Sequence, residues 1–282
     1  IFPVTTLRPE TIFGVTNLWV NPNVTYKKVT VDSETWIVSE QCARKIAFFE
    51  KEVKIIGDIA GSEIIGKSAI APNRGNEIPI LPAEFVEPGM GTGLVMSVPA
   101  HAPKDYQALM DLKAKNHELA SKIEPIPIIV TPGYDVFPAK QICEKLGVSN
   151  QTDEKLEEAT KELYLKEFTD GKLNEKCDIF NNEKVQFGRD KVREWLQENN
   201  HLEKFPVLEN APVHCRCGAE CVVKILNNQW FLNYGDEEWK ETARNCFDEM
   251  NILPSKITTE FKEVIDWLHE RACARQQGLG TK

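Results

Sequence analysis

The N-terminal peptide Thr5-Thr6-Leu7-Arg8-Pro9-Glu10-Thr11 places three hydroxyl groups, a guanidinium and a carboxylate within seven consecutive residues. Pro9 has no backbone N–H to donate to a neighbouring strand, so this peptide is not an ordinary central strand. Hydroxyl, guanidinium and carboxylate groups at this density can bind a polar ligand. The competing interpretation is an exposed strand edge, because threonine is common in strands.

A second candidate segment begins with Gly91-Thr92-Gly93. Glycines allow another group to approach the backbone closely, and Met96 and Val98 alternate onto one face of a strand. The chain then turns into a helix that starts near Asp105, which we expect at the rim of a pocket. An acidic residue in a first helical turn is also favoured by the helix dipole alone. No Lys-Ser or Lys-Thr pair follows the glycines, so a phosphate-binding P-loop is not supported.

The cysteines indicate reduced thiols, because most are far apart and a chain of 282 residues needs no disulfide framework. One cluster stands out, His214-Cys215-Arg216-Cys217-Gly218-Ala219-Glu220-Cys221. Its potential metal ligands are His214, Cys215, Cys217 and Cys221. Structural zinc usually takes two spaced ligand pairs, and the sequence has no second pair. We therefore predict a metal-free turn, with one knuckle of a zinc ribbon as the alternative.

Short strands must position the first two segments, since residues 1–94 are rich in strand-forming residues. Tyr26 to Val31 and Thr35 to Val38 predict a hairpin, and Ser39 is an N-cap for a helix. Pro103 predicts the first turn of a helix that runs to about residue 120. A strand interrupted by prolines is expected over residues 124–130.

The composition changes to charged helices over residues 138–208, which indicates an inserted helical lobe with helices at 153–168 and 190–199. Strand-like segments return at 222–226 and 230–234, and helices are predicted at 236–250 and 259–276. We divide the chain into a domain over residues 1–225, which contains the lobe, and a segment over residues 226–282.

The charge balance limits the class of partner. Lys plus Arg number 34 and Asp plus Glu number 43, so the formal net charge is −9. Broad affinity for a nucleic-acid backbone depends on a basic surface, so a nucleic acid must be gripped locally or by another part of a larger protein. No apolar run approaches the roughly 18 residues of a membrane helix, so we expect a cytoplasmic setting without a membrane. The chain starts without Met inside a predicted strand, and we expect a piece excised from a longer protein.

The two candidate segments together resemble the paired motifs of the editing domain that leucyl-, isoleucyl- and valyl-tRNA synthetases share. Further segments resemble the leucine enzyme in its eukaryotic and archaeal form; they are Arg8-Pro9-Glu10-Thr11 with Asn17 nearby, Ser97-Val98-Pro99, Asn228-Gln229-Trp230-Phe231, Tyr234-Gly235, and Arg271-Ala272-Cys273-Ala274-Arg275 to Gly278-Leu279-Gly280-Thr281. The resemblance runs from end to end and is weakest across the lobe. It implies an α/β fold: a β-barrel-like editing-domain core with surrounding helices and the inserted lobe.

This chain departs from the family pattern at two positions. Lys104-Asp105 stands where eukaryotic relatives usually have two aspartates, and His101 stands where they often have a small or acidic residue. Signatures of the His-Ile-Gly-His and Lys-Met-Ser-Lys-Ser type, which the synthetases need for ATP, do not occur. The resemblance therefore implies editing without amino-acid activation.

By resemblance, the reaction is hydrolysis of the ester between valine, isoleucine or a similar amino acid and leucine tRNA. Asp105 would hold the substrate's α-ammonium, and Thr5 and Thr6 would orient the attacking water and the terminal ribose. Thr11 would be the sieve that excludes leucine, and Arg8 would either pair with Asp105 or contact the nucleotide. The remaining residues of the implied substrate-binding set are Gly91, Thr92, Gly93, Met96, Val98 and His101.

No side-chain nucleophile, metal or cofactor is implied. A histidine has a suitable pKa for a general base, but we favour a rim or structural role for His101. The expected partners are the 3′ end of aminoacylated leucine tRNA, the rest of the parent synthetase and proteins of a synthetase assembly. Two alternatives are a non-catalytic docking module and the editing domain of a valine or isoleucine enzyme. Leu7 before Arg8-Pro9, and the segment around Trp230, argue against the valine and isoleucine enzymes.

Overall fold

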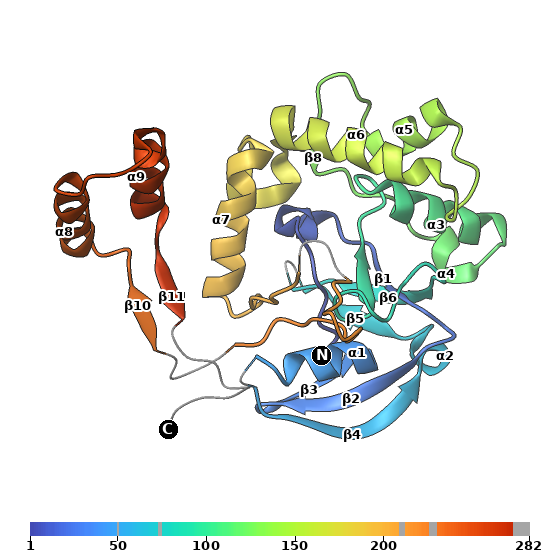
Figure 1. The fold of residues 1–282 in the computed structure, drawn as a ribbon. Coiled ribbons are helices and arrows are strands. Elements are labelled where there is room, and N and C mark those ends of the chain that lie inside the picture. Colours follow the sequence, from blue (N-terminus) through green and yellow to red (C-terminus); the bar gives the residue numbers. More distant parts are fainter. Residues whose placement is uncertain (50, 73–74, 209–211, 226–229, 273–282) are drawn as a thin grey trace. The chain divides into compact units, whose positions relative to one another are not determined.

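The computed structural model describes residues 1–49, 51–72, 75–208, 212–225 and 230–272. The chain divides into two compact units, Ile1–Lys224 and Ile225–Lys282 (Figure 1). The first unit is a mixed α/β fold with surrounding helices, as the sequence predicts. Within the described ranges, every helix is too short or too polar to span a membrane.

A four-stranded sheet in the order β5-β6-β1-β7 forms the centre of the first unit. Its strands are β1 (Asn17–Val20), β5 (Ser68–Ile70), β6 (Glu77–Pro82) and β7 (Leu94–Ser97). β1 runs parallel to β6 and antiparallel to β7, with Asn17 opposite Ser97. Because β1 follows the threonine-rich peptide and β7 follows Gly91-Thr92-Gly93, this pairing joins the two candidate segments.

A three-stranded sheet lies beside it in the order β3-β2-β4. Its strands are β2 (Thr25–Val31), β3 (Glu34–Val38) and β4 (Val53–Ala60), followed by the short helix α2 (Gly61–Ile64). The predicted hairpin is confirmed, with its turn at Asp32. The predicted cap is confirmed too, since the Ser39 hydroxyl accepts a hydrogen bond from the backbone of Cys42 in helix α1 (Glu40–Ile46). The Ser39 N–H donates to the Thr92 carbonyl, which ties this sheet to the second candidate segment.

Helix α3 (Pro103–Ala114) covers one face of the four-stranded sheet, where Trp19 packs against Ala108 and Leu109. The prediction that this helix reaches residue 120 is wrong. Asn116 adopts a left-handed backbone conformation, which ends the helix, and a separate helix α4 (Glu118–Ser121) follows. The strand predicted at 124–130 is reduced to β8 (Ile129–Val130), because Pro125 and Pro127 have no N–H to donate.

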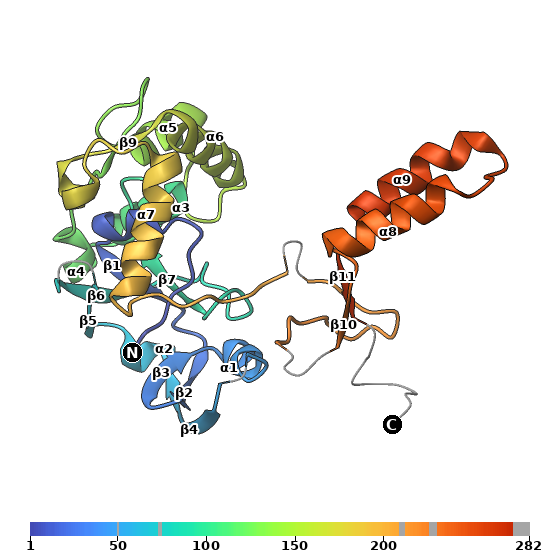
Figure 2. The same ribbon diagram turned by 90° about the vertical axis from the view of Figure 1, so that its left-hand side faces the viewer.

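The region in which the sequence predicts a helical lobe contains α5 (Pro138–Leu146), α6 (Lys155–Asp170), β9 (Lys172–Leu173), the 3₁₀ helix η2 (Glu175–Phe180) and α7 (Val185–Glu198). α7 begins five residues before the predicted helix start at 190, because its buried face already includes Val185 and Gly188. Figures 1 and 2 show α5 and α6 beside α3, and α7 beside the dark-blue N-terminal helical turn. The lobe also shares one apolar cluster with that turn, through Phe13, Val192 and Leu196.

The second unit contains a two-stranded ribbon of β10 (Phe231–Asn233) and β11 (Glu270–Ala272), with α8 (Glu237–Asp248), the 3₁₀ helix η3 (Ser255–Ile257) and α9 (Thr258–Trp267) between them. The predicted strand at 230–234 and helix at 236–250 are confirmed. The helix predicted at 259–276 is too long, because α9 ends at Trp267 and β11 follows. Residues 222–225 are not a strand. Residues 226–229 and 273–282, which carry part of the family resemblance, lie outside the described residues.

Truncation of Leu163 should destabilise the first unit, because its side chain is 0% exposed between α5 and α6. We expect Leu163→Ala to lower the free energy of unfolding by about 2–5 kcal/mol, the cost of lost burial and a cavity. Leu165→Ala on the same helix is the matched control, since Leu165 is 66% exposed. Urea denaturation followed by circular dichroism measures both, and equal effects of the two substitutions would contradict this packing.

Candidate functional site

The threonine-rich peptide folds around the backbone of Arg8. The Arg8 carbonyl accepts hydrogen bonds from the Thr11 N–H at 3.0 Å and the Thr11 hydroxyl at 2.7 Å. The Arg8 N–H donates to the Thr6 hydroxyl at 2.9 Å. Pro9 opens the 3₁₀ helix η1 (Pro9–Gly14), which buries Thr11. Thr5 and Thr6 are exposed residues, whereas Thr11 is buried and held by its bonds to the Arg8 carbonyl.

The two candidate segments meet at Gly91. A Cβ added to Gly91 would lie 1.9 Å from the Thr5 hydroxyl oxygen, so only glycine allows this approach. Gly91 also has a φ of +56°, which other residues rarely adopt. A Cβ at Gly93 would lie 2.6 Å from the Cβ of Ser39, the N-cap residue of α1. Thr92 between them is buried, with its hydroxyl donating to the Leu94 carbonyl. The space that both glycines leave open is thus filled by protein groups.

Met96 and Val98 form an apolar surface beside η1. Both side chains belong to the cluster that contains Ile12 and Phe13, the neighbours of Thr11 in sequence. Val98 is 4% exposed and Met96 is half-buried. The apolar residues of the second segment therefore pack against the helix that carries Thr11.

Asp105 lies in the first turn of α3, and its carboxylate holds the end of the sheet. One oxygen accepts from the Trp19 indole N–H at 3.1 Å, and the other accepts from the Val98 backbone N–H at 2.8 Å. The residue is 6% exposed, so it is buried and does not stand at an exposed rim as expected. Burial raises the pKa of Asp105 to about 7, although the two hydrogen bonds and the nearby Lys104 lower it.

Arg8 pairs with carboxylates other than Asp105, the partner that the sequence analysis gave as one alternative. Its Nε lies 3.0 Å from Glu10 Oε1 and its Nη2 lies 2.7 Å from Glu167 Oε2. The guanidinium stacks on the Tyr164 ring, 4.3 Å from the ring centre. These carboxylates raise the pKa of Arg8 against the opposing effect of burial. The Arg8 side chain is thereby engaged inside the protein.

His101 is not at the pocket rim, because its side chain is 0% exposed. Its Nε2 accepts hydrogen bonds from the backbone N–H groups of Ile128 at 2.8 Å and Ile129 at 3.2 Å. An acceptor at Nε2 places the proton on Nδ1, which lies 2.6 Å from Glu167 Oε1. Both ring nitrogens are occupied, which favours the structural role over a general base or a ligand contact.

Sequence reasoning missed Glu167, which contacts both Arg8 and His101. The sequence analysis predicted a charged helix over residues 153–168 and assigned no role to this glutamate. A signal was available, because Leu156, Ala159 and Leu163 form the buried stripe of α6 and Glu167 continues it one turn later. A carboxylate on the buried stripe of a helix needs partners, and here it has two.

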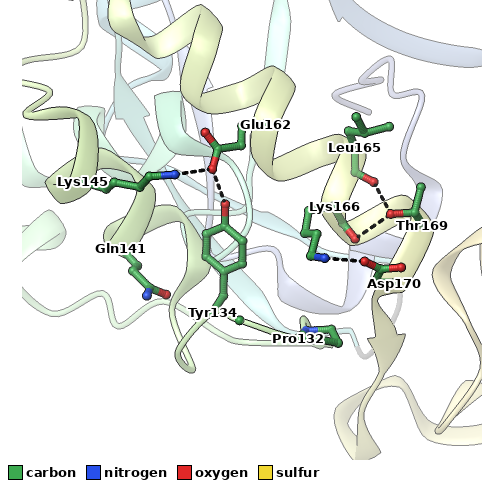
Figure 3. Close-up of a pocket in the computed structure, with 10 residues that line it drawn as sticks. Pro132, Tyr134, Gln141, Lys145, Glu162, Leu165, Lys166, Thr169 and Asp170 are labelled. Carbon is green, nitrogen blue, oxygen red and sulfur yellow. Dashed lines mark hydrogen bonds and ion pairs between the residues drawn. The ribbon is translucent and has the colours of Figure 1, made fainter.

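Other candidate features lie apart from these residues. A hollow of about 790 Å³ in the lobe contains none of the predicted site residues. Figure 3 shows its polar groups paired with one another, with Lys145 and Tyr134 on Glu162 and Lys166 on Asp170. In the cysteine cluster, the sulfurs of Cys215 and Cys217 are 3.1 Å apart. Among the described residues, no group of three or more His, Cys, Asp or Glu side chains is placed to hold a metal ion.

The buried carboxyl of Asp105 should make stability pH-dependent. A carboxyl whose pKa rises from 3.8 to about 7 on folding opposes folding once it ionises, so its stabilising contribution is present at low pH and lost as the pH rises through this range. Relative to Asp105→Asn, which cannot ionise, the protein should lose about 2–3 kcal/mol between pH 5 and pH 8, at 1.36 kcal/mol per pKa unit. Urea denaturation at both pH values measures this difference. The exposed Asp135→Asn is the control, and a pH-independent difference for Asp105→Asn would contradict the shift.

Comparison with known proteins places this geometry in a family. The family model described as "Leucyl-tRNA synthetase, editing domain" matches residues 1–116. The chain is 45% identical over 296 residues to the leucine–tRNA ligase of Methanocaldococcus jannaschii and 48% identical over 288 residues to that of Methanothrix thermoacetophila. Both alignments cover 100% of this chain and 31% and 30% of the ligases, so the chain spans about a third of their length.

Solved structures agree with the sequence relatives. The crystal structure of GlLeuRS-CP1 is 31% identical, with a TM-score of 0.66 over 74% of this chain and 83% of that chain. The cytosolic leucyl-tRNA synthetase editing domain of P. falciparum, at 24% identity, shares the fold, with a TM-score of 0.64 over 71% of this chain and 77% of that one. The chain therefore belongs to the family of leucyl-tRNA synthetase editing domains.

Proposed function

We propose that this chain hydrolyses the ester of leucine tRNA that carries valine, isoleucine or a similar non-cognate amino acid. The observation that carries the proposal is the contact of Thr5 with Gly91, which joins the threonine-rich peptide to the segment that leads to Asp105. The two segments together supply the exposed Thr5 and Thr6, the apolar Met96 and Val98, and the buried carboxylate of Asp105. This combination suits a substrate with a ribose, a small apolar side chain and an ammonium group.

Asp105 is the proposed anchor for the α-ammonium of the substrate. Each carboxylate oxygen already accepts one hydrogen bond, but an ionised carboxylate offers about four acceptor positions, so capacity remains for an ammonium group. A cation next to Asp105 also favours its ionised form. The anchor orients the scissile carbonyl, and such orientation supplies much of the rate in reactions without a covalent intermediate.

Thr5 and Thr6 are the proposed positioning groups for the attacking water and the terminal ribose. Both are exposed, and neither has a neighbouring base that would make its hydroxyl a nucleophile: the candidate His101 is buried and bonded at both ring nitrogens. Water is therefore the nucleophile in this proposal. The proposed role of Arg8 is indirect, because it holds the threonine-rich peptide in place.

Thr11 is the proposed sieve. Its hydroxyl donates to the Arg8 carbonyl, which restrains the side chain, and the residue is 4% exposed beside the apolar wall. A hydrophobic pocket separates substrates that differ by one methylene by only about 1–3 kcal/mol, and aminoacyl-tRNA synthetases are the standard example of a second, size-limited site as the remedy. A rigid branched residue provides that limit by steric exclusion.

The remaining partners follow from length and charge. The chain covers 31% of the length of its M. jannaschii relative and carries a net charge of −9, so we propose that other parts of a parent synthetase hold the tRNA and present its 3′ end. Residues 1–225 are the proposed editing domain and residues 226–282 the connection to the synthetic part. The proposed location is the cytoplasm, where other proteins of a synthetase assembly are further partners.

The sieve is tested with Thr11→Ala in the parent enzyme. Loss of the branched side chain should allow leucine to enter, so hydrolysis of correctly charged leucine tRNA should rise by at least about ten-fold, equivalent to about 1.4 kcal/mol. Thr11→Val is the matched control, because it keeps the branched shape and removes only the hydroxyl. Deacylation of leucine tRNA charged with radiolabelled leucine measures both. The sieve role fails if leucine stays attached in the Thr11→Ala enzyme.

The anchor is tested with Asp105→Ala and Asp105→Asn, which remove the charge. Both should lower hydrolysis of isoleucine-charged leucine tRNA by about 10²-fold or more, because loss of a charged contact that orients the reacting group costs several kcal/mol. Asp135→Asn, an exposed acid in the loop before α5, should behave as wild type. Normal hydrolysis in the Asp105→Ala enzyme would exclude the anchor role. Absence of hydrolysis in the wild-type enzyme would instead favour a docking module.

A further inference from the structure

Glu167 joins the helical lobe to both halves of the candidate site. Its carboxylate is 0% exposed, and each oxygen has a separate partner. Oε2 lies 2.7 Å from Arg8 Nη2, in the threonine-rich peptide, and Oε1 lies 2.6 Å from His101 Nδ1, in the segment that leads to Asp105. One side chain of α6 therefore bonds to a residue of each motif.

The bond from Glu167 to Arg8 affects the positions of the threonines in the N-terminal peptide. The backbone of Arg8 donates to the Thr6 hydroxyl and accepts from both polar groups of Thr11. The Arg8 side chain is held by Glu10, by Glu167 and by the Tyr164 ring one turn before Glu167 on α6, and its Nη1 also lies 3.5 Å from the His101 carbonyl. A shift of the guanidinium toward solvent would pull on the backbone that orders Thr6 and Thr11.

The bond from Glu167 to His101 affects the position of the segment that leads to Asp105. The His101 N–H donates to the Val98 carbonyl at 3.0 Å, and the Val98 N–H in turn donates to Asp105. The His101 ring accepts from the backbone N–H groups of Ile128 and Ile129, which keeps the turn between β7 and α3 in place. Removal of the Glu167 carboxylate would leave the Nδ1–H of this buried ring without its acceptor.

In the described part of the chain, two glutamates contact Arg8, and only Glu167 uses both of its carboxylate oxygens to bind partners. Glu10 reaches Arg8 with one oxygen, and within the described residues its second oxygen is buried without a hydrogen-bond partner. Burial raises the pKa of Glu10. Glu167, by contrast, uses both oxygens. Because Glu10 remains beside Arg8, neutralisation of Glu167 leaves the guanidinium with one carboxylate, which favours a folded variant.

We propose that Glu167 is a positioning residue for the editing reaction: it sets the distance between the threonine-rich peptide and the Asp105 segment through Arg8 and His101, without touching the substrate. The proposal rests on the proposed function. Because Glu167 belongs to α6, this role would make the inserted lobe part of the editing site. The register between Thr11 and the apolar wall then depends on α6, so the lobe contributes to amino-acid specificity as well as to rate.

The test is Glu167→Gln in the parent enzyme, with Glu158→Gln, an exposed glutamate on the same helix, as the matched control. Deacylation of leucine tRNA charged with isoleucine and with leucine gives kcat and KM for each. We expect kcat for isoleucine to fall by more than ten-fold, and the isoleucine-to-leucine ratio of kcat/KM to fall as well, because the sieve is displaced. Partial unfolding lowers both rates by the same factor, so an unchanged ratio would overturn the proposal.

Coupling to Arg8 gives a second readout. Because Glu167 acts through Arg8 as well as His101, Glu167→Gln should change the isoleucine-to-leucine ratio less in an Arg8→Gln background than in the wild type, and an equal change in both backgrounds would overturn the proposal. Should Glu167→Gln fail to fold, Glu167→Asp carries the same test, since its shorter side chain keeps the charge and cannot reach both partners. Absence of hydrolysis in the wild-type enzyme would reject the proposed function itself, which separates the two failures.

Discussion

The buried contact of Glu167 with Arg8 and His101 is the interaction on which the arrangement of the site depends. Ionised groups are costly to bury, and loss of one partner of a buried pair costs about 3–5 kcal/mol because the other charge is left uncompensated. The guanidinium, the imidazole and the carboxylate come from three distant stretches of chain. The lobe and the core are therefore held in one relative position wherever this cluster stays intact.

Asp105 is a second buried carboxylate that joins separate segments of the chain, and here burial raises the pKa of the group. Its two hydrogen bonds join the indole of Trp19 in β1 to the backbone beyond β7, so the carboxylate closes the end of the sheet. Burial raises its pKa to about 7, which brings the ionisation of this group close to neutrality. A buried carboxylate of this kind responds strongly to an approaching cation, because the cation supplies the counter-charge that the buried site lacks, which is the property that the proposed anchor role needs.

The two motif glycines explain why both segments are needed together. Gly91 and Gly93 do not leave an open cradle, because Thr5 and Ser39 occupy the space that their side chains would fill. The close approach of backbone and side chain brings the threonine-rich peptide against the second segment. The chemistry assigned to the site is thus a property of the junction, and neither segment holds it alone.

The sequence by itself determined the α/β class, the helical lobe, the hairpin, the Ser39 cap and the family, because these depend on local patterns and on motif identity. It also drew attention to the threonine-rich peptide and to Asp105 at a helix start, while the particular roles of Thr11 and Asp105 came from the family resemblance. Only the tertiary structure decided that Arg8 pairs with Glu10 and Glu167, that His101 is buried, and that α3 ends at Ala114. Pairing across 159 residues leaves no local signal, since a carboxylate on a charged helix looks solvated until the partner's position in space is known.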